Sequence, residues 1–135
     1  MLNVSTGKFS NQDSAHMLGK TVAVTMNATG SVLWAANDRG YIESFRVDSS
    51  TGKLQKGCRV QANRIGKSVT SMTARTSISK ITRDPCLLAT FESSDQLGLF
   101  RITDDFGTLV LFKSFSSGSG ANLRCAIIAP ILSYR

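Results

Sequence analysis

Two short segments of the sequence carry the residue types that end a phosphate-binding loop. Gly19–Thr21 reads GKT and Gly66–Ser68 reads GKS. Such a loop also needs an earlier glycine and a following helix, because the amides of the helix N-terminus hold the phosphate. Ser14 and Gln61 occupy the positions of the earlier glycine, and strand-forming residues follow both lysines. The two segments therefore predict no nucleotide site.

The remaining side chains that could catalyse a reaction are scattered. His16 is the only histidine, and no G-x-S-x-G motif presents a serine to it. Asp84, Asp104 and Asp105 lie in turn sequences, where aspartate bonds nearby backbone amides. The adjacent pair offers too few oxygen ligands for calcium. The residues alone therefore predict no enzyme, no metal and no cofactor.

The cysteine pattern and the apolar runs indicate an intracellular protein. Cys58, Cys86 and Cys125 are widely separated and lack histidine partners, so we expect reduced thiols rather than disulfides or a zinc site. The longest apolar run, around 125–132, is too short to span a bilayer. Residues 1–10 lack the basic and apolar regions of a secretory signal. We therefore expect no membrane contact.

The chain is basic, with 16 Lys and Arg against 9 Asp and Glu and a formal net charge of +7. The cations never form a basic block, and this scatter is typical of solvated strand faces and turns. The alternative is a nucleic-acid-associated β module, which requires the cations at repeated positions to gather on one surface. Those cations are Lys20, Lys67, Arg46 and Arg101.

Short alternating or continuous apolar runs between turn clusters predict two groups of four strands. The first group is Thr21–Met26, Ser31–Ala36, Tyr41–Val47 and Leu54–Val60. The second group is Ser68–Ala74, Leu87–Phe91, Leu97–Ile102 and Leu109–Phe115. Tight turns within each group indicate antiparallel meanders. A longer connection spans Arg75–Pro85, and a further strand is expected at Leu123–Ile128.

The two groups are an internal repeat. Three pairs of similar segments show it: Gly19–Val22 and Gly66–Val69, Phe45–Val47 and Phe100–Ile102, Ser5–Phe9 and Ser50–Leu54. A four-stranded repeat of about forty to fifty residues is typical of β-propeller blades. The phase of the repeat predicts an all-β chain of about two and a half blades, an incomplete ring. The blade boundaries follow: 1–18 ends a preceding blade, 19–62 is one blade, 63–117 is another with an insertion near 75–85, and 118–135 begins a truncated blade.

The residues in the turns and at the strand ends of the repeat can be compared with those of a known family of repeat proteins. Asp38 and Asp95 lie between the second and third strands, and Phe45-Arg46 and Phe100-Arg101 close the third strands. In these features the sequence resembles the WD-repeat β-propellers, which place Asp in that turn and Trp-Asp at that strand end. The family's Gly-His is missing and the acid is replaced by arginine. The resemblance implies a WD40-type propeller and a non-enzymatic scaffold that binds other proteins, largely in the nucleus.

The same residues have expected roles. The residues predicted to fix turns are Asp38, Gly40 and Asp95. Trp34 is expected in the core. Arg46 and Arg101 either stack beside phenylalanine and cover strand edges or present guanidinium groups to an acidic partner. An incomplete ring exposes apolar faces, so we expect the isolated chain to self-associate.

Overall fold

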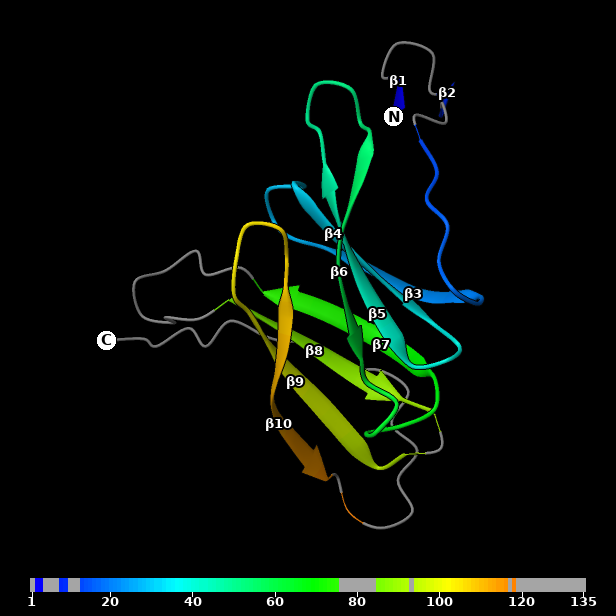
Figure 1. Cartoon of the computed structure of the whole chain (residues 1–135), viewed down its shortest axis with the longest axis vertical. Helices are drawn as coiled ribbons and strands as arrows, with labels where there is room; N and C mark the ends of the chain where they lie inside the picture. The colour runs from blue at the N-terminus through cyan, green and yellow to red at the C-terminus, as the bar shows by residue number, and fades with distance from the viewer. Residues whose placement is uncertain are drawn as a thin grey trace, which may run out of the picture.

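The computed structural model describes residues 2–3, 8–9, 13–75, 85–92, 94–116 and 118, whose strands form three antiparallel sheets (Figure 1). A small hairpin joins β1 (Leu2–Asn3) and β2 (Lys8–Phe9). The first large sheet holds, in order, β3 (Thr21–Met26), β4 (Val32–Asn37), β5 (Tyr41–Val47) and β6 (Leu54–Gln61). The second holds β7 (Val69–Arg75), β8 (Cys86–Phe91), β9 (Gln96–Ile102) and β10 (Leu109–Ser116).

The described residues contain no helix, so the all-β prediction is confirmed. The eight predicted strands of the two groups all form, with ends displaced by one residue at most. Alternating side chains and turn residues act locally, which is why these strands could be placed from the sequence. The structure does not describe the strand expected at Leu123–Ile128 or residues 76–84 of the expected connection. Asp84 and Cys125 therefore lie outside the described residues.

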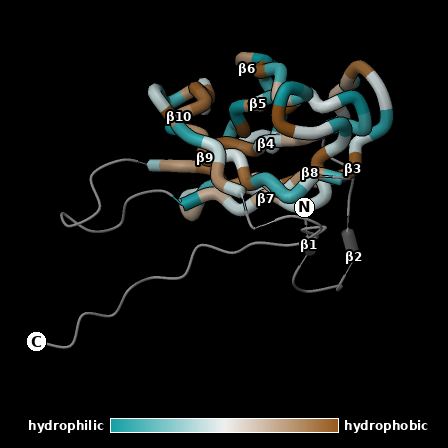
Figure 2. The backbone as a smooth tube through the Cα atoms, turned by 90° about the horizontal axis from the view of Figure 1, so that it is seen from below, coloured by the Kyte–Doolittle hydropathy of each residue, from teal (hydrophilic) through white to brown (hydrophobic). Residues whose placement is uncertain are grey.

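The two large sheets pack face to face around one core. Figure 2 shows β4, β5 and β6 lying over β7 and β8. Trp34 and Ile42 from the first sheet and Leu87, Phe91 and Phe100 from the second are all buried in this core. β3 and β7, the first strands of the two sheets, contact each other. The prediction that Trp34 lies in the core is therefore confirmed.

The segment before β3 covers part of the opposite face of the first sheet. Asp13 accepts a hydrogen bond from the amide of Leu54 at the start of β6, at 2.8 Å. At the other end of the sheet, the side-chain amide of Asn37 donates to the carbonyl of Leu18. Phe45 points away from the second sheet because side chains alternate along a strand, yet it is buried. The segment is thus tied to both ends of the first sheet, on which Phe45 is buried without contact to the core between the sheets.

Apolar side chains remain exposed on one edge strand of each large sheet. Val24 and Met26 on β3 and Val110 and Phe112 on β10 are examples, and Phe112 is 60% exposed. Exposed apolar strands are surfaces that other chains can cover. Self-association of the isolated chain stays a prediction that these surfaces support.

A pH-dependent contribution to stability is expected from the β9–β10 turn. The carboxylate of Asp104 accepts bonds from the Thr108 side chain and from the amides of Thr108 and Phe106, which lowers the pKa of Asp104 below its usual value. A lowered pKa in the folded state stabilises the protein above the unfolded pKa, and this contribution is lost as the pH falls through the folded pKa.

We therefore expect the wild type to exceed Asp104→Asn in free energy of unfolding at about pH 6, with the difference shrinking towards about pH 2. Urea unfolding of both proteins at the two pH values measures it. Other acidic groups titrate equally in both proteins and cancel in the comparison. A difference that does not change with pH would contradict the expected role of the carboxylate.

Candidate functional site

The turn between β4 and β5 meets the start of β3 at one end of the molecule. The amide of Lys20 donates to the carboxylate of Asp38 at 3.0 Å, and the amide of Asp38 donates to the carbonyl of Lys20 at 2.9 Å. The side-chain oxygen of Asn37 accepts bonds from the amides of Arg39 and Tyr41. Gly40 closes the turn with a φ of +77°, a conformation that glycine adopts without strain. The turn therefore holds Lys20 and Arg39 near each other.

The same turn also touches the linker that leads into β7. Ala62 donates its amide to the carbonyl of Gly40 at 2.7 Å. A side chain on Gly40 would lie 2.9 Å from the Cβ of Asn63 and 3.0 Å from the carbonyl oxygen of Lys67. Gly40 is therefore required by close packing as well as by its backbone angle. Through this contact the starts of β3 and β7 share one end of the molecule.

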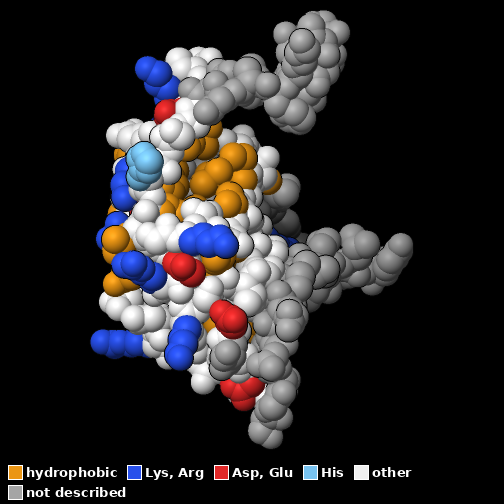
Figure 3. All heavy atoms as spheres, turned by 90° about the vertical axis from the view of Figure 1, so that its right-hand side faces the viewer, with side chains coloured by type: hydrophobic (Ala, Val, Ile, Leu, Met, Phe, Trp, Pro, Cys, Tyr) orange, Lys and Arg blue, Asp and Glu red, His pale blue; other side chains and the backbone are white. Residues whose placement is uncertain are grey.

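We define the basic end as the four exposed cations at this position, Lys20, Arg39, Arg64 and Lys67. The β8–β9 turn joins it, because the amide of Glu92 donates to the carbonyl of Ser68 at 2.7 Å. Figure 3 looks from the side of Figure 1 on which β3 and β7 begin, and shows Lys and Arg side chains spread over it with Asp and Glu side chains among them. The arrangement can bind an anion or stabilise negative charge that develops in a reaction.

The residues predicted to fix turns lie in turns, but they bond differently. Asp38 bonds the backbone before β3, as described above. Asp95 instead accepts a bond from the hydroxyl of Ser116 at the end of β10, at 3.1 Å. The two aspartates lie at opposite ends of their turns, because Asp38 directly follows β4 and Asp95 directly precedes β9. Their contribution to turn stability stays a prediction.

Arg46 and Arg101 lie at the other end of the strands from the basic end. The guanidinium group of Arg46 lies 5.2 Å from the ring centre of Phe106, which belongs to the β9–β10 turn. That of Arg101 lies 4.8 Å from the ring centre of Phe112 on β10. Arg46 thus bridges the two sheets, whereas Arg101 stacks within its own. Binding of an acidic partner by either arginine stays a prediction.

The four cations at repeated positions therefore do not gather on one surface. Lys20 and Lys67 stand at the starts of the first strands, and Arg46 and Arg101 near the ends of the third strands. The charge arrangement that the nucleic-acid alternative required is absent among these described residues. The repeat places each pair at one end because equivalent residues of equivalent strands occupy equivalent positions.

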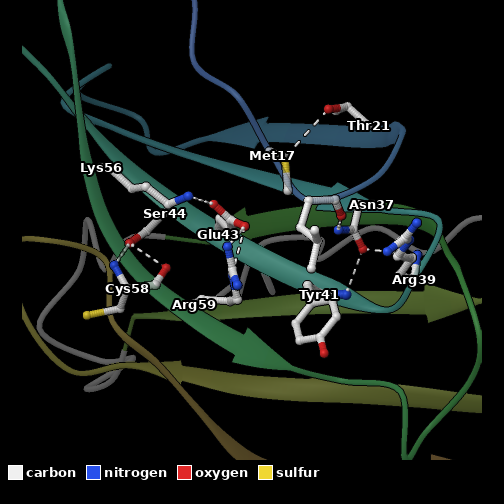
Figure 4. Close-up of polar contacts among 11 residues, drawn as sticks. Met17, Thr21, Asn37, Arg39, Tyr41, Glu43, Ser44, Lys56, Cys58 and Arg59 are labelled. Atoms are coloured by element: carbon white, nitrogen blue, oxygen red, sulfur yellow. Dashed lines mark hydrogen bonds and ion pairs between the residues drawn. The ribbon is translucent and has the colours of Figure 1, made fainter.

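A buried ion cluster on β5 and β6 was not anticipated from the sequence (Figure 4). Glu43 is 0% exposed. Its Oε1 accepts from Nε of Arg59 at 2.8 Å, and its Oε2 lies 2.7 Å from Nζ of Lys56, at ion-pair distance without hydrogen-bond geometry. The ring of Tyr41 lies 5.5 Å from the Arg59 guanidinium.

The ion cluster has a structural rather than a catalytic role. Both oxygens of Glu43 face cations and no water-accessible lone pair remains, so this carboxylate is not available as a base. The signal for the cluster lies in the strand register, which sets Glu43 opposite Arg59. A register shift between Glu43 and Phe45 breaks the regular pairing of β5 and β6. Counting residues from the turn that joins these strands therefore would not have predicted that Glu43 faces Arg59.

Solved structures with known names share this fold, although no protein-family model matches the sequence. A Bacteroides uniformis protein assigned as a 6-phosphogluconolactonase superposes with a TM-score of 0.61 and 18% identity, over 82% of this chain and 31% of its own. The periplasmic gluconolactonase of Pseudomonas aeruginosa superposes with a TM-score of 0.58 and 25% identity, over 79% of this chain and 29% of its own. The chain has the fold of part of a lactonase. It spans about a third of the length of these proteins.

This finding corrects several expectations. The resemblance to WD-repeat proteins is wrong, because the structures that share the fold are lactonases. The resemblance was based on Asp in a turn and Phe-Arg at a strand end. Such residues are typical of turns and strand ends in unrelated repeat proteins as well. The expected non-enzymatic scaffold of the nucleus and its nucleic-acid alternative are wrong for the same reason, since both neighbours are named as enzymes.

Two further properties concern only the described residues. They include no helix long and apolar enough to cross a membrane. They also include no group of three or more His, Cys, Asp or Glu side chains placed to hold a metal ion.

Proposed function

We propose that the chain forms two neighbouring blades of a β-propeller hydrolase that opens a sugar lactone. The observation that carries the proposal is the shared fold with a gluconolactonase at 25% identity over 79% of the chain. The first blade is 19–62 and the second is 63–117, with 1–18 and 118–135 contributing to adjacent blades. The complete ring, its substrate and its activity are parts of this proposal, because the chain matches only 29% of that protein.

The basic end is our candidate for the part of the active site that this chain supplies. Propeller blades surround a central channel. In each four-stranded blade we assign the first strand to the wall of this channel. β3 and β7 are these strands and contact each other. Lys20 directly precedes β3 and Lys67 lies two residues before β7, so both lysines would stand at the mouth of the channel. Ligands bind preferentially where loops converge on such an opening.

The basic end suits the charge changes of lactone hydrolysis. Water attacks the carbonyl carbon, and the carbonyl oxygen becomes negative before the ring C–O bond breaks. Lys67 and Arg39 supply positive charge where this oxyanion develops. Glu92, exposed and beside Ser68, is the candidate base that takes the proton from water and returns it to the ring oxygen. The products are a carboxylate and a hydroxyl group of one hydroxy acid.

Hydrolysis of D-glucono-1,5-lactone by the chain, followed by base consumption at constant pH, tests this function. We expect a rate above spontaneous hydrolysis and a decrease in kcat/KM of about 100-fold for Lys67→Ala, the loss expected for one group that stabilises an oxyanion. Lys113→Ala is the matched control, because Lys113 is an exposed lysine on β10, away from the basic end. A rate equal to the spontaneous one, or equal losses in the two variants, would refute the proposal.

A further inference from the structure

A groove lies beside the β5–β6 hairpin, at the end of the strands opposite the basic end. Its volume is about 710 Å³, and its lining includes Arg46, Val47, Asp48, Ser49, Lys53 and Gln55. Pockets that bind small molecules commonly have volumes of about 300–1,000 Å³. We call this the hairpin groove. Neither the lactonase fold nor the basic end assigns it a role.

Arg46 is held in place at the groove without donating a hydrogen bond to any residue that the structure describes. Its guanidinium group stacks on Phe106 of the second sheet at 5.2 Å. Within the described residues, Arg46 forms no ion pair. A stacked guanidinium keeps its planar set of N–H donors, which matches the two oxygens of a carboxylate. The stacking therefore fixes the side chain in advance and lowers the entropy cost of binding an anion.

Other polar side chains of the hairpin groove complement a ligand with hydroxyl groups. Gln55 stands opposite Arg46 in the register of β5 and β6. Gln55, Ser49 and Lys53 are exposed, and none of their side chains makes a hydrogen bond within the described part of the chain. An amide and a hydroxyl both donate and accept hydrogen bonds, as the hydroxyl groups of a ligand do. Val47 adds an apolar wall.

The one carboxylate of the hairpin groove is already occupied. Asp48 accepts bonds from the Ser50 hydroxyl at 2.6 Å and from the amides of Thr51 and Ser50 at 2.7 and 2.9 Å. These bonds lower its pKa, so it stays ionised and directed into its own turn.

Arg46 and Lys53 carry the positive charges of the groove. Asp13, which accepts a bond from the amide of Leu54, adds a second negative charge close to Lys53. Arg46 forms no ion pair with either carboxylate, so its charge and its N–H donors are available to a ligand.

We propose that the hairpin groove binds a small carboxylate that also carries hydroxyl groups, with Arg46 on the carboxylate and Lys53, Ser49 and Gln55 on the remainder. This binding does not depend on lactone hydrolysis, because it uses other residues at the other end of the strands. A phosphate would match the charge but could only accept bonds from Ser49 and Gln55. The hydroxyl groups of a hydroxy acid also donate to the side-chain oxygens of these residues, so the polar lining favours a hydroxy acid.

Titration of the ¹⁵N-labelled chain with gluconate, followed by amide chemical shifts, tests this proposal. We expect shifts at Val47, Ser49 and Lys53, and no binding of glucitol, which has the hydroxyl groups without the carboxylate. Arg46→Met should weaken gluconate binding by about tenfold or more, the loss expected for one charge-assisted contact. Lys53→Met, in an exposed turn remote from the core, provides a second variant that should weaken binding without affecting the fold.

Two control variants show whether gluconate binds at the hairpin groove or elsewhere on the chain. Arg101→Met removes the equivalent arginine of the second sheet and should leave gluconate binding unchanged. Lys67→Ala, which tests the proposed hydrolase, should leave the gluconate-induced shifts at Val47, Ser49 and Lys53 unchanged, even though gluconate is the product of that hydrolysis and can also bind at the basic end. The two proposals can therefore fail separately. Equal binding of glucitol, or unchanged gluconate affinity in both Arg46→Met and Lys53→Met, would overturn the proposal.

Discussion

Trp34→Ala should lower the free energy of unfolding by about 3–5 kcal/mol, the usual cost of truncating a buried tryptophan. Trp34 is 1% exposed and belongs to the core between the two sheets. Its indole N–H also donates to the carbonyl of Gly107 in the β9–β10 turn, at 2.8 Å. The side chain thus joins the two sheets by packing and by one buried hydrogen bond. Domain stabilities are about 5–15 kcal/mol in total, so this single change removes a large share.

Trp34→Phe separates the two contributions. Phenylalanine retains much of the apolar ring but leaves the carbonyl of Gly107 without its donor, which should cost about 1–3 kcal/mol. Urea unfolding should be followed by circular dichroism, because Trp34 is the only tryptophan and its fluorescence is lost in both variants. A loss below about 1 kcal/mol for Trp34→Ala would contradict the packing of the two sheets around this residue.

Gly107→Ala is the second change with a large expected effect, a loss of about 2–5 kcal/mol. Gly107 has a φ of +77°, and a left-handed conformation costs other residues about 1–2 kcal/mol. The added Cβ would also lie 2.5 Å from Cγ1 of Val32 and 3.0 Å from the ring of Trp34. Both neighbours are buried, so relieving the clash displaces the core at a cost of about 1–3 kcal/mol.

Gly30→Ala is the matched control for this change. Gly30 has a similar φ of +71°, but the nearest atom to an added Cβ is the sulfur of Met26 at 3.7 Å. This variant should therefore lose only the cost of the backbone conformation. Urea unfolding of both variants gives the difference, which isolates the clash with Val32 and Trp34. Equal losses in the two variants would show that Gly107 does not touch the core as described.

The strands and turns could be predicted because the forces that specify them act between residues close in sequence. The strand-forming runs "TVAVTM" and "YIESFRV", each bounded by turn residues, mark two of the strands. They do not mark the buried face, because Val22, Val24 and Met26 are exposed whereas Ala23 packs against the core. Asn37 and Gly40 favour the turn that joins β4 and β5 through contacts within four residues. The family could not be read in the same way. Turn aspartates and strand-end aromatics are required by many four-stranded repeats, whatever their function.

The candidate sites depend on contacts that the sequence does not display. The basic end forms only when the Gly40 turn meets the linker before β7. The hairpin groove needs Arg46 stacked on Phe106, a residue of the other sheet. The sequence by itself determined an all-β chain of two four-stranded repeats, because side-chain alternation and turn propensity are local. Only the tertiary structure decided which cations share an end, since the packing of one sheet on another joins residues far apart along the chain.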